Sequence, residues 1–436
     1  MFFKSSFLKN VTVLITGTVI AQLITIIVAP ILGRIYTPED FGFYGFYLSL
    51  TGIISIIVTG RYEMAIFITG RKEKATYVFN TAIIITFLVS SLALLISIVF
   101  LLLNKHLSAW YYGLSFSILA SGIIQTITIF ANYEKRYKLI SNNAVLRSLI
   151  ANTIFILLGF LGFGISGLMI GLIVGQIIQV LHFFFYLKID LLLNNYNYRV
   201  FKSVVSTYKN FLKFSTLSSF INSLSIQLPV LFLKSFFSQI QVGHYFQSYK
   251  LLTLPNSVIA KSIGSVFVQK ASEHLNNNES ISDFVIKLYK KLILISFLPY
   301  SILLVFGDII ITFVLGNQWS EAGIYAQIIS PWIYINFIVI PFTYLFEILQ
   351  KQKLFTILNT ILIIARGLSL LIGFYFQSVY YSIFLFSISS FIIYGVILFF
   401  IFKLAKIKGI LNHCMYIIFY IISVLILILI RYSVLG

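Results

Sequence analysis

The chain is a succession of long apolar segments separated by short polar connections. Most segments have the length of about 20 residues that an α-helix needs to cross a bilayer. The pattern predicts membrane helices at roughly 11–33, 42–60, 77–103, 110–132, 144–162, 166–187, 211–233, 246–269, 288–315, 324–349, 354–376, 379–402 and 412–430. We therefore expect an all-α polytopic membrane protein with a core of twelve spans, and 412–430 is a candidate additional span.

Lysine and arginine are concentrated on alternate connections between these segments. Of the 31 basic residues, 24 fall on one set of loops, and four fall on the other: Arg34, Lys105, Lys234 and Arg431. Arg147, close to the start of segment 144–162, is counted with the larger group. Because basic loops resist translocation, this sorting predicts a cytoplasmic N-terminus.

Composition supports the same class of protein. The chain is 59% hydrophobic and 10% charged, with a mean hydropathy of +1.00, whereas soluble domains carry about 25% charged residues. The net charge of +19 is explained by cytoplasmic loops that face anionic lipids, so no nucleic-acid partner is expected. A single cysteine and five scattered histidines predict no disulfide, metal site or cofactor.

The lengths of the predicted loops indicate how the chain is divided into lobes. The predicted outer loops have about a dozen residues or fewer, which leaves no outer domain for an active site and argues against an enzyme. The inner loop 188–210 carries the stripe of an interfacial amphipathic helix (Val200, Phe201, Val204, Val205 and Tyr208), and a solvated connector is the alternative. The predicted parts are an N-terminal six-helix lobe (1–187), a linker (188–210), a C-terminal six-helix lobe (211–405) and a candidate thirteenth helix (406–436).

An offset of about 200 residues aligns sparse features of the two predicted lobes. Pro30, Arg34, Gly42, Tyr44 and Arg61 fall opposite Pro229, Lys234, Gly243, Tyr245 and Lys261. Duplicated helical bundles are typical of transporters, in which the pathway lies between the repeats.

Polar side chains share single faces of three predicted spans. The candidate contacts to a substrate are their amides: Gln22 in the first span, Gln125 and Asn132 in the fourth, and Asn222 in the seventh. Such stripes line water-filled cavities in membrane proteins, and helix-to-helix packing is the alternative for each stripe.

Three cations lie inside the predicted spans: Lys250, Lys261 and Arg366. An ammonium at the bilayer centre costs about 2.5–3.5 kcal/mol on insertion scales, so a compensating partner is expected. Lys250 and Lys261 are eleven residues apart and would share one face of a continuous helix. Because these cations outnumber the intramembrane acids, we expect an anionic, phosphate-bearing substrate.

Roughly the first 75 residues contain three motifs that resemble one family. They read Thr16-Gly17-Thr18-x-x-Ala21-Gln22, Pro30-x-Leu32-x-Arg34-x-Tyr36-Thr37-Pro38-Glu39-Asp40-Phe41-Gly42 and Thr59-Gly60-Arg61-Tyr62-Glu63-x-Ala65-Ile66. They are similar to the signature of Wzx-type polysaccharide flippases of the multidrug/oligosaccharidyl-lipid/polysaccharide exporter superfamily. Thr37 and Pro38 also have a local explanation, because they suit the cap and first position of a helix.

The resemblance implies two six-helix lobes around a central cationic cavity. It implies export of undecaprenyl-pyrophosphate-linked oligosaccharide, such as an O-antigen unit, from the inner to the outer leaflet of a bacterial cytoplasmic membrane. Arg34 and Arg61 match basic positions of the signature. The implied partners are that lipid-linked oligosaccharide, membrane lipids, a polysaccharide polymerase and a chain-length regulator.

Two other functions remain open on the sequence. A membrane-embedded polymerase or glycosyltransferase would need a larger outer loop or an acidic catalytic cluster. A small-molecule antiporter of the multidrug exporter type would need buried acids to hold cationic drugs.

Overall fold

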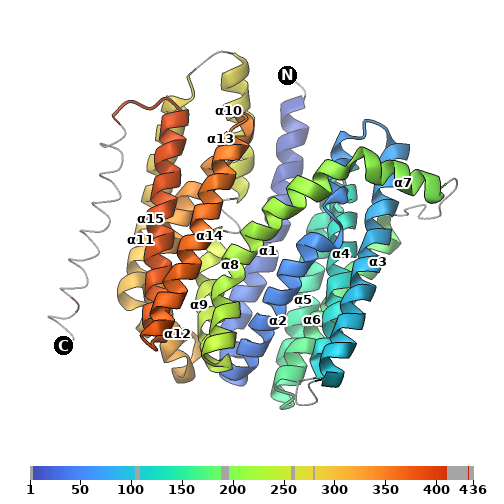
Figure 1. Ribbon diagram of the computed structural model, residues 1–436. Coiled ribbons are helices and arrows are strands. Elements are labelled where there is room, and N and C mark those ends of the chain that lie inside the picture. The colour runs from blue at the N-terminus through green and yellow to red at the C-terminus, as the bar shows by residue number, and fades with distance from the viewer. Residues whose placement is uncertain are drawn as a thin grey trace. The chain divides into compact units, whose positions relative to one another are not determined.

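The computed structural model describes residues 3–103, 109–187, 196–256, 261–277, 280–409 and 431. The candidate span 412–430 and the first part of the predicted linker lie outside these residues. The described chain is helical and contains no strand, which confirms the predicted all-α class (Figure 1). Eleven helical segments of the described chain are long and apolar enough to cross a membrane.

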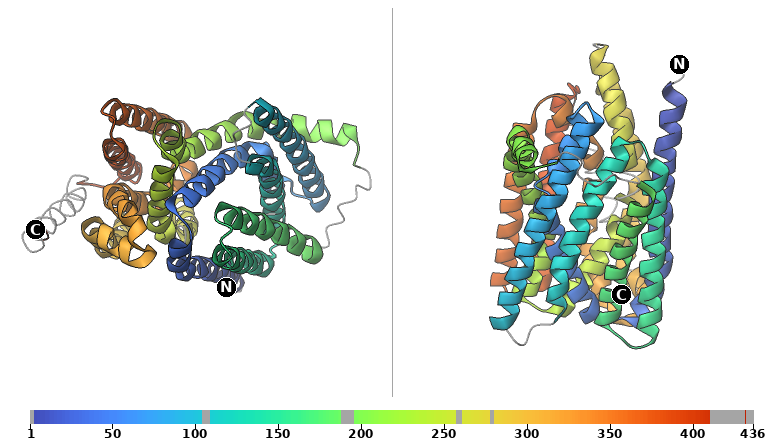
Figure 2. Two further views of the ribbon diagram at one scale, coloured as in Figure 1. Left: turned by 90° about the horizontal axis from the view of Figure 1, so that it is seen from below. Right: turned by 90° about the vertical axis from the view of Figure 1, so that its right-hand side faces the viewer.

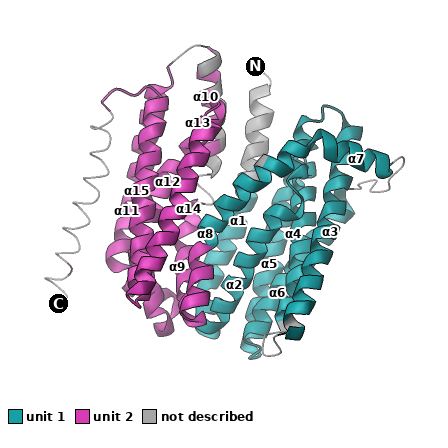
Figure 3. Cartoon of the chain, in the orientation of Figure 1, with its two compact units in different colours: residues 1–227 teal, residues 228–436 magenta. Residues whose placement is uncertain are grey.

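The chain divides into two compact units, residues 1–227 and 228–436, which we call unit 1 and unit 2 (Figure 3). The division falls inside helix α8, between Gln227 and Leu228. The first half of α8 is tied to unit 1 by hydrogen bonds to α2. Ser49 Oγ donates to Gln227 Oε1 at 3.0 Å, and Ser223 Oγ donates to the Gly52 carbonyl at 3.5 Å.

Unit 1 is a bundle of long helices with four short helical elements between them. Its elements are α1 (Phe3–Ile35), α2 (Pro38–Val58), η1 (Tyr62–Ile68), α3 (Lys72–Leu103), η2 (Ala109–Tyr111), α4 (Tyr112–Tyr133), α5 (Tyr137–Phe160), α6 (Ile165–Leu187), α7 (Tyr198–Thr207), η3 (Phe211–Ser215) and the start of α8 (Thr216–Phe236). Seen end on, the long helices stand side by side (Figure 2), with α1 packed on α5, α5 on α6 and α3 on α4.

Local chemistry explains where α2 begins. The Thr37 side chain accepts a hydrogen bond from the Asp40 N–H at 3.2 Å, and Asp40 Oδ2 accepts from the Thr37 N–H at 3.0 Å. Pro38 is the first helical residue. This is a capping box, and it confirms the helix start read from the motif.

Unit 2 is built around α12, which has more buried residues than the other described helices of the unit. The elements are the end of α8, then α9 (Gln239–Pro255), α10 (Lys261–Asn276), α11 (Ser282–Leu315), η5 (Asn317–Trp319), α12 (Ser320–Val339), η6 (Ile340–Phe342), α13 (Tyr344–Ile348), α14 (Gln352–Tyr375) and α15 (Val379–Leu404). α12 packs against α9, α11 and α15. Unit 2 is thus layered around one central helix.

The predicted span 246–269 is not among the eleven membrane-length helices. Its first residues belong to α9, which begins earlier, at Gln239, where the Ser238 side chain accepts from the Gln241 N–H. Polar residues at the start of α9 are buried in packing, among them His244 and Gln247. The hydropathy pattern missed this helix start because the buried side chains there are polar.

Candidate functional site

The motif Gly60-Arg61-Tyr62-Glu63 forms a tight turn between α2 and η1. Gly60 and Arg61 both have positive φ, 59° and 60°, a region that few non-glycine residues adopt. The turn buries Tyr62, whose hydroxyl donates to the Val205 carbonyl at 3.3 Å. Burial raises the pKa of the Tyr62 hydroxyl, so Tyr62 remains a neutral donor.

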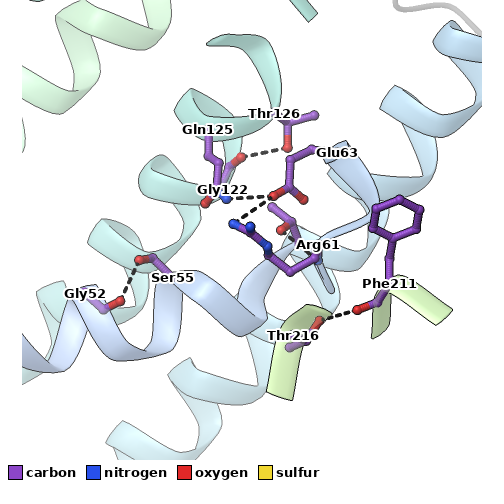
Figure 4. A network of polar contacts seen from close by, with 10 residues as sticks. Gly52, Ser55, Arg61, Glu63, Gly122, Gln125, Thr126, Phe211 and Thr216 are labelled. Carbon is purple, nitrogen blue, oxygen red and sulfur yellow. Dashed lines mark hydrogen bonds and ion pairs between the residues drawn. The ribbon is translucent and has the colours of Figure 1, made fainter. Parts of the chain in front are cut away.

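The turn brings Glu63 against α4 (Figure 4). The Glu63 side chain has 0% exposure, and its Oε1 accepts a hydrogen bond from Gln125 Nε2 at 2.7 Å. Arg61 Nη1 lies 3.9 Å from the same oxygen and keeps 21% of its side chain exposed. The buried carboxylate is therefore held mainly by the Gln125 amide, while the arginine retains exposed surface.

These contacts give two of the predicted substrate residues a local role. Gln125 is engaged with Glu63, which the polar stripe on its helix did not reveal. Arg61 forms an ion pair with Glu63, two residues further along the same turn. Glu63 itself was not among the predicted site residues, although it lies two positions after Arg61 in the motif.

Arg147 is a cation that the sequence placed at the cytoplasmic edge and the structure places within a span. It is the eleventh residue of α5, about 15 Å from the helix start at 1.5 Å per residue. Its side chain is exposed, although Tyr44 of α2 and Gly175 of α6 are close neighbours. No carboxylate lies within 4.0 Å of Arg147 among the described residues.

Amide side chains lie next to Arg147 on the contact between α5 and α6. One helical turn before it, Asn143 Nδ2 donates to the Gln179 carbonyl at 2.9 Å and lies 3.1 Å from His182 Nδ1. The side-chain oxygens of Asn143, Gln176 and Gln179 are buried and have no hydrogen-bond partner within the described chain. Unit 1 therefore combines an unpaired guanidinium with three acceptors that could receive hydroxyl donors. The signal that could have found this cluster is its spacing: Asn143 and Arg147 are four residues apart, and Gln176 and Gln179 are three apart.

In unit 2, Arg366 is enclosed by aromatic side chains. It is 1% exposed, and its Cζ lies 4.8 Å from the Trp332 ring centroid, 4.9 Å from Phe386 and 6.0 Å from Tyr394. Its Nε donates to Ser390 Oγ at 2.9 Å. These contacts compensate a cation inside the apolar part of unit 2.

Arg34 and Lys234 are the two cations that fall opposite each other when the chain is offset by about 200 residues. Each is in the last turn of its helix, four or five residues after a proline. Arg34 Nη1 donates to the Pro30 carbonyl at 3.0 Å, and Lys234 Nζ donates to Gln239 Oε1 at 2.6 Å. Cations at helix C-termini are favourable there for structural reasons alone.

The other predicted site residues are spread over several helices. Gln22 on α1, Asn132 near the end of α4 and Lys250 on α9 are half-buried, and Asn222 on α8 is exposed. Lys261 is the first residue of α10, and its side chain is not among those that the structure describes. Since residues 257–260 are also outside the described chain, the shared face of Lys250 and Lys261 stays a prediction.

The sequence matches the family model of polysaccharide biosynthesis proteins over residues 31–324, which is more than half of the chain. The chain belongs to this family. None of the curated proteins that were compared matches it.

Solved structures share the fold at low sequence identity. The lipid II flippase MurJ, in an inward closed conformation, is similar with a TM-score of 0.71 and 15% identity, over 96% of this chain and 98% of that chain. An inward-facing multidrug resistance transporter of the MATE family has a TM-score of 0.63 and 15% identity, over 92% of this chain and 100% of that chain. A MOP superfamily transporter from Pyrococcus furiosus, described by a reversed polarity of its binding pocket, has a TM-score of 0.59 and 13% identity, over 91% and 96%. This polysaccharide biosynthesis protein therefore has the fold of MOP superfamily transporters, as the motif resemblance predicted.

Proposed function

We propose that the protein is a flippase that moves an undecaprenyl-pyrophosphate-linked oligosaccharide from the inner to the outer leaflet of the bacterial cytoplasmic membrane. The proposal rests on the family of the chain combined with its fold. A chain of the polysaccharide biosynthesis family has, over 96% of its length, the fold of a lipid II flippase. The family supports the glycan part of the substrate, and the fold supports its transport with a lipid.

The charges of the described spans support an anionic cargo. Two carboxylates have described partners: Glu63 pairs with Gln125, and Asp308 pairs with Arg431, whose Nη1 donates to Asp308 Oδ1 at 3.0 Å. Arg147, in contrast, has no carboxylate within 4.0 Å in the described residues. A pyrophosphate would supply the missing negative charge, and a guanidinium suits phosphate oxygens because its donors are arranged as a planar fork.

The glycan would meet the amides beside Arg147. Sugar hydroxyls donate hydrogen bonds, and a buried acceptor without a donor costs about 1–3 kcal/mol. The acceptors of Asn143, Gln176 and Gln179 thus match a hydroxylated ligand next to the cation. We include Arg147 in the proposed site together with the residues nominated from the sequence.

The proposed mechanism is alternating access, in which the site opens first to one side of the membrane and then to the other. The substrate biases this exchange only through a difference in its affinity for the two states. The polar headgroup would be sheltered by the protein, while the polyprenyl chain would stay in the lipid.

The decisive experiment measures delivery of lipid-linked oligosaccharide to the outer leaflet. Deletion of the protein should make this lipid accumulate on the inner leaflet, and unchanged delivery would reject the proposal. Arg147→Ala should lower delivery about 10- to 100-fold at equal protein abundance, the effect of losing a hydrogen bond to a charged group. Lys138→Ala is the matched control, because Lys138 is an exposed cation in the first turn of the same helix.

The similarity to a MATE transporter favours one second candidate, a small-molecule antiporter. The two functions separate in a single strain that carries Arg147→Ala. Loss of glycan delivery with unchanged drug resistance supports the flippase, and the reverse pattern supports the antiporter. The remaining alternative, a polymerase, would require that the purified protein lengthen a lipid-linked glycan.

A further inference from the structure

A groove lies between α3 and α7 in unit 1, on the side that the distribution of basic residues assigns to the cytoplasm. Its volume is about 420 Å³, within the range of about 300–1,000 Å³ that is typical of small-ligand pockets. Val78 and Val204 belong to the hydrophobic cluster beneath it. The side chains of Lys74, Arg199, Ser203 and Thr207 also line it.

The protein itself fixes the walls of this groove. Val204 is 8% exposed and belongs to the core cluster shared with α3, so α7 is held against unit 1 by its apolar face. Just before α7, the Tyr196 hydroxyl lies 2.6 Å from Thr81 Oγ1 of α3. The Asn197 side chain caps α7 by accepting from the Val200 N–H at 3.1 Å. The groove is therefore a built feature between two packed helices.

Two cations in the groove have no acidic partner in the described chain. Neither Lys74 nor Arg199 has a carboxylate within 4.0 Å there, although Lys72, two residues before Lys74, is paired with Glu134 at 2.7 Å. The nearby acid Glu73 accepts a hydrogen bond from Tyr77 at 2.7 Å and does not line the groove. The groove thus presents two positive charges together with hydroxyl donors.

The position along α3 identifies the kind of ligand. Lys74 is in the first turn of a 29-residue apolar span, so the groove is at the level of the lipid headgroups. Basic pockets at this depth bind the phosphates of anionic lipids, and the hydroxyls of Ser203 and Thr207 can donate to phosphate or glycerol oxygens. The geometry points to a binding site for one anionic glycerophospholipid, with its phosphate between Lys74 and Arg199 and its glycerol against α7.

Native mass spectrometry of the purified full-length protein tests this site. The lipid is titrated as phosphatidylglycerol or as phosphatidylcholine with the same acyl chains, and wild type should prefer phosphatidylglycerol. The double variant Lys74→Ala/Arg199→Ala should weaken phosphatidylglycerol binding about 30-fold, since each basic residue near an anionic headgroup contributes about a fivefold change. Lys202→Ala/Lys209→Ala is the matched control, because it removes two exposed cations of the same segment that do not line the groove.

A third variant separates the groove from surface charge. Ser203→Trp keeps both cations but fills the groove, and it should also abolish the preference for phosphatidylglycerol. The proposal is overturned if Ser203→Trp binds like wild type, or if the control pair weakens binding as much as the groove pair. It is also overturned if a polyprenyl pyrophosphate binds the groove while phosphatidylglycerol does not. Transport is not the readout, so this proposal and the flippase proposal can fail independently.

Discussion

The contact between Glu63 and Gln125 allows a quantitative prediction about unit 1. The perturbation is a double-mutant cycle with Glu63→Ala, Gln125→Ala and both together. Because the Glu63 side chain has 0% exposure and the hydrogen bond is 2.7 Å long, it belongs to the class of buried bonds to charged groups. Such bonds contribute about 1.5–3 kcal/mol, so we expect a coupling free energy of about 2 kcal/mol.

The same carboxylate provides a second, weaker cycle. Arg61 is 3.9 Å from Glu63 Oε1 and its side chain is 21% exposed, so solvent screens the pair. Exposed ion pairs contribute about 0–1 kcal/mol, and we expect about 0.5 kcal/mol for Arg61 with Glu63. The amide, rather than the opposite charge, should therefore dominate the stability of this turn.

The assay is equilibrium unfolding of the purified protein in mixed micelles, with helix content followed by circular dichroism. A control cycle uses Glu73 and Tyr77, which form an exposed hydrogen bond of the same length, 2.7 Å, on one helix. It should couple by only about 0.2–0.5 kcal/mol, because pairs four residues apart on a helix surface are weak. The reasoning is refuted if the Glu63–Gln125 coupling free energy is smaller than that of the exposed Glu73–Tyr77 pair. It is also refuted if the Arg61–Glu63 coupling free energy is larger than that of Glu63 with Gln125.

Three further substitutions test individual contacts, two through the free energy of unfolding and one through the rate of proteolysis. Arg366→Lys removes the planar group stacked among three rings and should destabilise unit 2 by about 1–3 kcal/mol; an unchanged midpoint would contradict the aromatic enclosure. Gly171→Ala would place a methyl group 2.4 Å from an aromatic ring carbon of α5 and should cost about 1–3 kcal/mol. Its control, Gly367→Ala, meets nothing within 4 Å and should be neutral or stabilising by up to about 1 kcal/mol. Asn197→Ala removes the cap of α7 and should weaken that helix by about 1 kcal/mol, seen as faster proteolysis near it. Asn210→Ala, at a helix start without a side-chain cap, should leave proteolysis unchanged.

Much of the fold could be predicted because membrane helices are encoded locally. Eleven of the predicted spans match membrane-length helices, and the start of α2 follows from Thr37, Pro38 and Asp40. The start of α9 could not be predicted in this way. Its buried side chains include His244 and Gln247, so hydropathy and burial disagree there.

The candidate site was less predictable than the fold. The motif indicated Arg61. The sequence could not show that Gln125, on α4, donates a hydrogen bond to Glu63, which follows the turn after α2. Arg147 was counted with the residues of the basic loops because it lies close to the predicted start of the span 144–162. Its depth became evident only when α5 was seen to begin at Tyr137.

The sequence by itself determined which segments are helices, that they belong in a membrane, and which family they resemble. These properties depend on apolar runs, caps and short motifs, whose physics acts within a few turns of chain. Only the tertiary structure decided which polar side chains are already engaged and which are not. That distinction arises because Gln125, the partner of Glu63, and Trp332, the partner of Arg366, come from other helices, and burial multiplies the energetic consequence of each contact.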